Sequence, residues 1–481
     1  MSQSAHAYAY LRPSAVVDGA AGRSLALETS GGATPLGDAA HPRFFAGFLA
    51  EPAPAAAALL AVADVAAARY YQPQLRASLD PVVTANGDRL RFESFSGCCG
   101  VYARLDVLAA GLDGGAIGHG TTNVDVNNPL REALTRIAPA EPLHLAVGPD
   151  ALEVTTFDGP VVEKKVPLPE RWLRGFAETQ VTAAGFDLRA ELPAAEAVRF
   201  LRSLPRGGRA GARTVQWVVL AGRTLRPTTR PVAGAVCLPG PERLAALQRV
   251  LRHARALRIY GPPAVGDGPT ASAWEVELPG MRLTLTLSPD PSRGFSGEGG
   301  VLGALATGTA EPDADLVATL LAWEPRIEVA ELAEQAGLAP ARVRAALTRL
   351  GTAGQIGYDV AEAAYFHRRL PYESGRAESA NPRLKAARAL VAAGAVRLEE
   401  GGATAVVTVD DHVQRVRTEA AGAVGCTCLW WAKYRGGRGP CKHVLAVGMV
   451  REAQAGAGAG SGIHARTRTR GQDGGVREGT R

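Results

Sequence analysis

Residues 426–443 read CTCLWWAKYRGGRGPCKH. This stretch contains two closely spaced pairs of metal-binding side chains, Cys426 with Cys428 and Cys441 with His443. Because side chains alternate along an extended strand, both thiolates of a Cys-x-Cys pair point to the same side and can reach one ion. Three thiolates and one imidazole are a standard ligand set of structural zinc sites. The stretch therefore predicts a small domain organised around one structural zinc ion.

The predicted site is closed, because protein side chains fill all four tetrahedral positions. No position is left for an activated water, so we expect no metal catalysis here. Zinc binding in such sites is largely folding energy, on the order of 10 kcal/mol. Thiolate-rich sites also accept other soft metal ions, so the pattern defines the ligands more firmly than the metal.

The ligand spacing and its surroundings resemble the SWIM zinc finger, whose pattern is Cys-x-Cys, a variable gap and Cys-x-His. The resemblance covers residues 394–450, with CTCLW before the gap and PCKHVLA after it. It implies a surface that contacts nucleic acid or protein. The segment 92–180, which contains LPERWLRGF, is similar to the amino-terminal region that accompanies this finger in bacterial SWIM proteins. That similarity implies a bacterial protein with AAA-type ATPase or von Willebrand-type partners.

Aromatic and cationic side chains are interleaved in the loop between the two ligand pairs. Rings suit base stacking and cations suit phosphate neutralisation, which together favour nucleic-acid binding. A second interpretation is that Trp430 and Trp431 pack beneath the zinc site, in a domain with little other core. The candidate nucleic-acid contacts in this region are Trp430, Lys433, Tyr434, Arg435, Arg438 and Lys442.

Positive charge is concentrated near the end of the chain. The net charge is +6, yet residues 425–481 alone hold ten Lys and Arg against three Asp and Glu, so the preceding residues sum to −1. Local positive charge favours contact with a polyanion, although a solubilising tail has the same composition. Residues 451–481 are rich in Ala, Gly and Arg and cannot bury enough apolar surface to fold, so we predict a disordered basic tail.

Residues 312–372 show three short helical patterns followed by a hairpin, which resembles a winged helix-turn-helix domain. The third helix, predicted at 339–350, has apolar residues at i, i+4 and i+7 that form one inward stripe. Residues 313–370 contain eight acidic and six basic side chains, so contact with DNA and contact with protein both stay open. The outward side chains that would contact DNA are Arg342, Arg344 and Arg349, joined in the wing by Arg368 and Arg369.

Residues 1–305 mix strand-like and helix-like stretches between Gly and Pro clusters, as expected of an α+β region. The stretch SGCCG places Cys98 and Cys99 between two predicted strands, with His119 and Asp125 following. A cysteine-dependent enzyme would use one of these thiols as a nucleophile. The alternative is two small side chains in a crowded turn, since nothing in the sequence indicates a lowered thiol pKa. Strands are predicted at 89–95, 143–147, 152–157, 214–220 and 281–287, and a helix at 54–71.

The sequence therefore predicts an α+β multidomain protein. Its parts are a mixed α/β N-terminal region of unknown function (1–305), a winged-helix-like domain (312–372), a SWIM zinc-finger domain (381–450) and the disordered tail (451–481).

The composition favours a cytoplasmic protein. Six cysteines are too few for a disulfide scaffold, and three of them cluster with a histidine. The first residues lack the pattern of a secretory signal, and the apolar stretch 55–68 is too short to cross a bilayer. We expect no membrane partner and no small-molecule substrate. The leading hypothesis is a zinc-binding, non-enzymatic adaptor that contacts nucleic acid through the finger, the tail and the winged helix. The alternatives are a protein-interaction scaffold, for example with an ATPase partner, and the cysteine-dependent enzyme.

Overall fold

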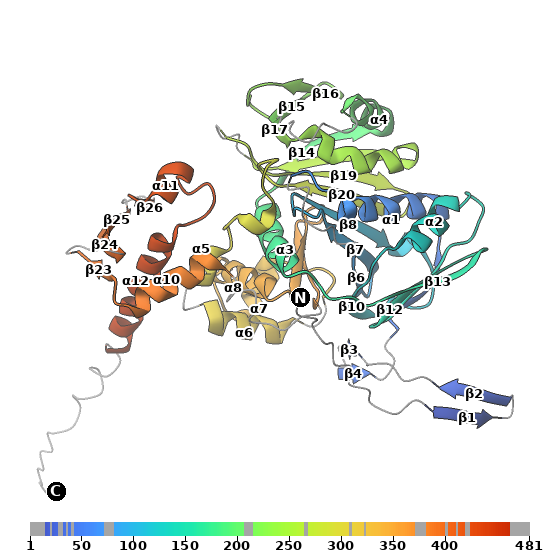
Figure 1. The fold of residues 1–481 in the computed structure, drawn as a ribbon, viewed down its shortest axis with the longest axis horizontal. Coiled ribbons are helices and arrows are strands. Elements are labelled where there is room, and N and C mark those ends of the chain that lie inside the picture. Colours follow the sequence, from blue (N-terminus) through green and yellow to red (C-terminus); the bar gives the residue numbers. More distant parts are fainter. Residues whose placement is uncertain are drawn as a thin grey trace, which may run out of the picture. The chain divides into compact units, whose positions relative to one another are not determined.

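The computed structural model describes residues 15–19, 22–26, 32–34, 37–39, 43–71, 81–205, 215–263, 268–306, 310–321, 324–370, 381–399, 403–409, 412–418 and 424–461. The chain divides into two compact units, which are residues 1–301 with 312–377 and residues 302–311 with 378–481. Figure 1 labels the elements of both units. Each unit combines helices with β-sheet, which confirms the mixed α/β class predicted from the sequence.

The first unit is built on an antiparallel sheet, in which the described strands follow the order β10-β6-β7-β8-β20-β19-β18-β14 (Figure 1). The sequence of β7 explains the two faces of this sheet. Leu90 and Phe92 alternate with Arg89, Arg91 and Glu93, so apolar side chains lie on one face and charged side chains on the other. The strands are β6 (Val82–Asn86), β7 (Arg89–Phe95), β8 (Val101–Leu108), β10 (His119–Asn123), β14 (Asp187–Pro193), β18 (Ala256–Gly261), β19 (Ser272–Leu278) and β20 (Met281–Leu287).

Helices cover the apolar face of this sheet. α1 (Pro52–Ala67) packs on β7 and β8, and the 3₁₀ helix η2 (Pro241–His253) packs on α1 and β19. The Ala, Leu and Val side chains of α1 are buried almost throughout, because the sheet, η2 and α2 (Asn128–Arg136) all contact this helix. Leu90 and Phe92 belong to the same hydrophobic core.

The first unit also contains smaller sheets. The order β13-β12-β11-β5-β9 joins β5 (Phe45–Leu49), β9 (Leu112–Gly114), β11 (His144–Val147), β12 (Ala151–Thr156) and β13 (Gly159–Lys164). The order β16-β15-β17 joins β15 (Val215–Ala221), β16 (Thr224–Thr228) and β17 (Val236–Pro239). Further elements are β1 (Ala15–Gly19), β2 (Gly22–Ala26), β3 (Gly32–Thr34), β4 (Gly37–Ala39), η1 (Ala109–Gly111), α4 (Ala194–Ser203) and η3 (Phe295–Gly297). The predicted strands correspond to β7, β11, β12, β15 and β20, and the predicted helix to α1.

The charged face of the central sheet is also buried. It is covered by α3 (Glu170–Ala183), whose Phe176 packs on Phe95, and by the hairpin of β21 (Ile356–Asp359) and β22 (Ala364–His367). Asp359 of this hairpin accepts hydrogen bonds from Arg104 at 2.7 Å and from Arg282 at 3.0 Å. Burial raises the pKa of the Asp359 carboxyl, but the guanidinium groups of Arg104, Arg91 and Arg282 outweigh burial and hold this pKa well below its usual range.

The segment 312–372 has the predicted order of elements: α6 (Ala310–Leu320), α7 (Val329–Ala336), α8 (Pro340–Thr352) and then the hairpin. It shares a compact unit with residues 1–301, because α8 packs on α3 and the hairpin is ion-paired to the central sheet. The expectation of a basic wing was wrong for Arg368, which is 1% exposed and paired with Glu93. Arg369 is exposed. A buried counter-charge in the sheet explains the inward position of Arg368.

The second unit is a small four-stranded sheet packed with helices, as far as its described residues show. The strand order is β23-β24-β25-β26, with a core that includes Ala405, Val407, Val416 and Val447. α10 begins directly after Asn381, because the Asn381 side chain accepts hydrogen bonds from the backbone N–H groups of residues 383 and 384. The elements are α5 (Leu302–Ala306), α10 (Pro382–Ala392), β23 (Val396–Leu398), β24 (Thr404–Val409), β25 (His412–Thr418), β26 (Val424–Cys426), α11 (Leu429–Tyr434) and α12 (Lys442–Ser461).

The end of the finger differs from its predicted position. α12 continues beyond residue 450 to Ser461, since Ala is the best helix former and offsets the Gly residues of this stretch. The rest of the predicted tail, residues 462–481, lies outside the described residues. None of the helices in the described residues has the length and apolarity that a bilayer crossing requires.

Candidate metal centre

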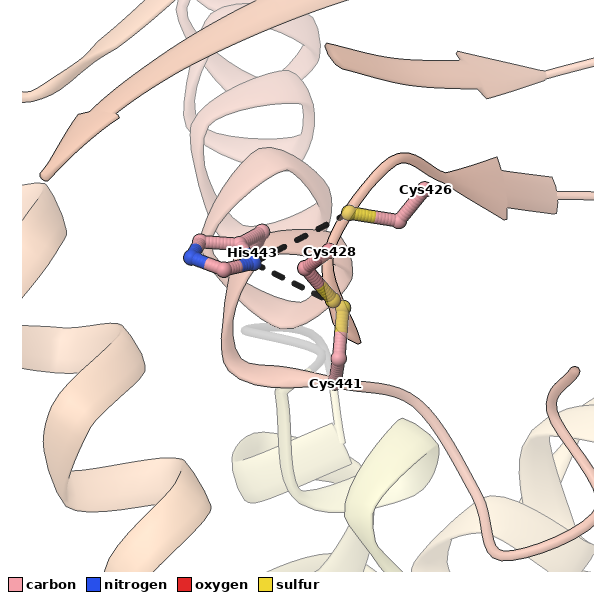
Figure 2. A group of neighbouring side chains, drawn as sticks. All are labelled: Cys426, Cys428, Cys441 and His443. Atoms are coloured by element: carbon pink, nitrogen blue, oxygen red, sulfur yellow. Dashed lines mark hydrogen bonds between the residues drawn. The ribbon is translucent and has the colours of Figure 1, made fainter. Parts of the chain in front are cut away.

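The four predicted ligands come from the ends of three elements in the second unit (Figure 2). Cys426 is the last residue of β26, and Cys428 precedes α11, where its sulfur accepts a hydrogen bond from the backbone N–H of Trp431 at 3.4 Å. Cys441 directly precedes α12, and His443 lies in the first turn of that helix. The strand end and the two helix starts therefore bring the two ligand pairs together.

The distances fit one tetrahedral ion. The ligand atoms of all four residues lie within 4.8 Å of one another, and the sulfurs of Cys426 and Cys441 are 3.8 and 3.9 Å from Nδ1 of His443. Zinc bound to sulfur at about 2.3 Å and to nitrogen at about 2.0 Å holds its ligand atoms roughly 3.5–3.8 Å apart. Cys428, Cys441 and His443 are buried, while Cys426 is half-buried. The four residues are positioned to bind one zinc ion.

A hydrogen bond connects the thiols of Cys426 and Cys441. Hydrogen bonding with Cys426 lowers the pKa of the Cys441 thiol, and the same bond raises the pKa of Cys426. Burial raises the pKa of Cys428. A metal ion binds the deprotonated thiolates, so zinc would displace these protons, and affinity would fall as pH is lowered.

The ligands lie inside a segment that matches a known domain. Residues 407–447 match the family model of the SWIM zinc finger. The matched segment includes the end of β24, all of β25, β26 and α11, and all four ligands. The chain thus carries a SWIM zinc finger, which confirms the resemblance inferred from the ligand spacing and supports zinc binding.

No curated protein sequence matches the chain significantly. The chain is similar to proliferating cellular nuclear antigen from Entamoeba histolytica, at 10% identity and a TM-score of 0.33, over 52% of this chain and 99% of that one. It is also similar to the PCNA2-PCNA3 complex from Sulfolobus tokodaii, at 8% identity and a TM-score of 0.35, over 51% of this chain and 99% of that chain. Both TM-scores are too low to infer a shared fold.

The loop between the ligand pairs places its rings and cations against one another. Trp430 and Tyr434 have ring centroids 4.6 Å apart, and the Arg438 guanidinium lies 5.0 and 4.8 Å from these two centroids. The guanidinium of Arg383, from α10, lies 4.6 Å from the Trp430 centroid. These rings are therefore packed with guanidinium groups beside the zinc site. Hydrogen bonding to Lys433 lowers the pKa of Tyr434.

The candidate contacts differ in exposure. Lys433 and Arg435 are exposed, while Trp430, Tyr434, Arg438 and Lys442 are half-buried, and all six lie in or beside the zinc loop. The three arginines of α8 belong to the other unit. Arg342 is exposed and pairs with Asp313 at 2.6 Å, Arg344 is exposed and Arg349 is half-buried. Sequence reasoning missed Arg383, because its contact with Trp430 joins segments that are distant along the chain.

The cysteines of the N-terminal region are not arranged as a catalytic pair. Cys98 and Cys99 follow β7 and are 3% and 0% exposed, and burial raises the pKa of the Cys99 thiol to about 12. His119 pairs with Asn86, next to the start of β7. A strand of this length spans about 20 Å, so His119 lies too far from Cys98 to accept its proton.

Proposed function

We propose that this chain is a non-enzymatic adaptor of the bacterial cytoplasm whose SWIM finger binds zinc structurally and contacts nucleic acid. The observation that carries the proposal is the positive charge around the metal site. Residues 381–461 hold eleven Lys and Arg against six Asp and Glu, and Lys433 and Arg435 extend into solvent from the zinc loop. A cluster of exposed cations on a rigid, metal-fixed loop suits phosphate contact.

The closed ligand set supports the non-enzymatic part of this proposal. Four protein ligands leave the zinc ion no position for substrate or for an activated water. The cysteines of the N-terminal region are buried and distant from His119, so they offer no alternative nucleophile.

The winged-helix-like segment offers fewer cations for contact with nucleic acid. Its hairpin is buried against the central sheet, and Arg342 is already paired with Asp313, so Arg344 is the α8 arginine with the most open position for phosphate. The basic tail beyond residue 461 would add affinity through its Arg-Thr repeats.

The salt dependence of DNA binding tests the proposal. We expect the full-length, zinc-loaded chain to bind labelled DNA at 50 mM salt, and log affinity to fall linearly with log salt concentration. The double variant Lys433→Ala/Arg435→Ala should make the slope of log affinity against log salt concentration shallower by about two. Each lost phosphate contact removes about 0.9 from the magnitude of that slope. The matched control is Arg223→Ala/Arg226→Ala, which removes two exposed cations of the first unit. Absence of binding at low salt, or an equal loss in the control, would contradict nucleic-acid contact by the finger.

The second candidate is a protein-interaction scaffold, for example with an ATPase partner. It is favoured by two exposed apolar side chains of the second unit, Leu429 at 90% and Val413 at 56% exposure. Affinity capture with and without nuclease separates the two candidates. A partner that stays bound after nuclease treatment supports the scaffold, whereas a partner lost with the nucleic acid supports the adaptor.

A further inference from the structure

A pocket of about 430 Å³ lies beside the metal centre, entirely within the second unit. It is formed by the start of α10, the start of α11 and the second ligand pair, and Cys428, Cys441 and His443 line it. A zinc ion held at about 2.0–2.3 Å by four ligands fills only a small part of such a volume. Most of the pocket is therefore available to a ligand other than the metal.

One wall of the pocket is apolar. Pro382 and Ala386 of α10 face this space together with Leu429 and Trp430 of α11. Leu429 is 90% exposed, which is unusual for a leucine beside a buried metal site. Trp430 already carries the Arg383 guanidinium over its ring, so Leu429 is the apolar side chain that a ligand would cover.

The polar groups around this wall are cationic or neutral. Arg383, Lys442 and Gln414 line the pocket, and none of its described lining residues is acidic. Lys442 lies between the two ligands Cys441 and His443 in the sequence, so metal binding would fix its backbone. The pocket thus combines an apolar wall with positive charge, which suits a planar group attached to an anion.

We propose that this pocket takes an unpaired base of a single-stranded nucleic acid, with the adjoining phosphate on Lys442, since the Arg383 guanidinium already donates to the carbonyls of Arg438 and Pro440. This inference rests on the proposed function and narrows it. A base in a duplex is stacked and paired, and it enters a pocket only when it is flipped out at a cost. Bases of a single strand are free to turn into a pocket, pack on an apolar surface and leave their phosphates at its rim. The finger is therefore selective for single strands, with little preference for sequence.

The experiment compares a labelled single-stranded 12-mer with the matching duplex, at one salt concentration and with the full-length, zinc-loaded chain. We expect the single strand to bind about tenfold more tightly than the duplex. Leu429→Ser removes the apolar contact and Ala386→Phe fills the pocket, and each should lower single-strand affinity about tenfold while duplex affinity stays unchanged. Lys442→Gln should weaken single-strand binding and reduce its salt dependence.

The controls are matched to these variants. Val413→Ser removes an exposed apolar side chain of the same unit outside the pocket, and Arg397→Gln removes an exposed cation of β23. Both should bind the single strand like the unsubstituted chain. Each variant must retain one zinc ion per chain, so that loss of binding is not loss of the finger.

The outcomes separate this inference from the proposed function. Equal affinity for single strand and duplex, with no effect of Ala386→Phe, overturns the single-strand pocket and leaves phosphate contact by the finger intact. Absence of binding to both forms at low salt overturns the proposed function as well. If the chain binds poly-glutamate more tightly than the single strand, and Leu429→Ser abolishes that binding, the ligand is an acidic polypeptide. This result overturns the inference.

Discussion

The guanidinium of Arg368 donates to the Glu93 carboxylate at 2.5 Å, and these side chains are 1% and 0% exposed. Arg368 follows β22 and Glu93 lies in β7, so the ion pair joins the hairpin to the central sheet. Arg104 and Asp359 form a second contact of this kind, at 2.7 Å. Buried charges therefore hold the hairpin of β21 and β22 on the central sheet within the first unit. A buried charge that loses its partner is far more costly than an exposed one.

Glu93→Gln should destabilise the first unit by about 3 kcal/mol, because the buried Arg368 guanidinium would lose its counter-charge. Urea unfolding measures this change as a difference in the free energy of unfolding. The control is Asp158→Asn, which breaks an ion pair with Arg136 whose side chains are both 62% exposed and should cost about 0–1 kcal/mol. If the two variants lower the free energy of unfolding equally, the buried Arg368–Glu93 pair stabilises the fold no more than an exposed ion pair does.

Asp359 makes the stability of the first unit sensitive to acid. Its folded pKa lies below the unfolded value of about 3.9, so its contribution is fully present above that value and is lost as pH falls through the folded pKa. We expect the free energy of unfolding to decrease as the pH is lowered below about 4. Asp359→Asn should be less stable at pH 7 and should show a shallower decrease, which thermal unfolding over a pH series measures. If the free energy of unfolding of Asp359→Asn depends on pH as it does in the unsubstituted chain, Asp359 is not the source of the acid sensitivity.

The buried ion pairs of Asp359 and Arg368 could not be predicted from the sequence. The alternation in β7 correctly predicted a strand, because the period of two is a local property of residues 89–95. The same alternation does not show whether the face that carries Arg89, Arg91 and Glu93 is buried or exposed. They are buried because Asp359 and Arg368, which are distant in sequence, supply their counter-charges. Such pairing depends on tertiary contacts that no local pattern encodes.

The metal centre was predictable for the opposite reason. Two short ligand pairs carry their chemistry in their spacing, so Cys426, Cys428, Cys441 and His443 could be assigned without knowledge of the fold. The pocket beside them could not be assigned, because Pro382 and Ala386 reach it from α10 through the packing of that helix. The sequence therefore predicted the four metal ligands but not the pocket beside them.

Removal of the metal should unfold the finger and spare the first unit. Cys441→Ala leaves three ligands, and the free energy of zinc binding is largely the folding energy of so small a domain. We expect the variant to lose zinc and to become protease-sensitive between residues 381 and 461, while the helices and strands of the first unit resist cleavage. His412→Ala, which removes an exposed histidine of β25, should keep its zinc. Less than half an equivalent of zinc in the purified, unsubstituted chain would contradict the site itself.

Thiol labelling should divide the six cysteines into two groups. Cys98, Cys99 and Cys237 are buried in the first unit, and burial raises the pKa values of Cys99 and Cys237 to about 12 and about 11, so little reactive thiolate exists at neutral pH. The other three, Cys426, Cys428 and Cys441, are positioned to bind zinc. We expect a thiol reagent to label the native, zinc-loaded chain slowly, and a chelator to release the three finger cysteines for rapid labelling. Rapid labelling of Cys98 or Cys99 before chelation would contradict their burial and would restore the cysteine-dependent enzyme as a serious hypothesis.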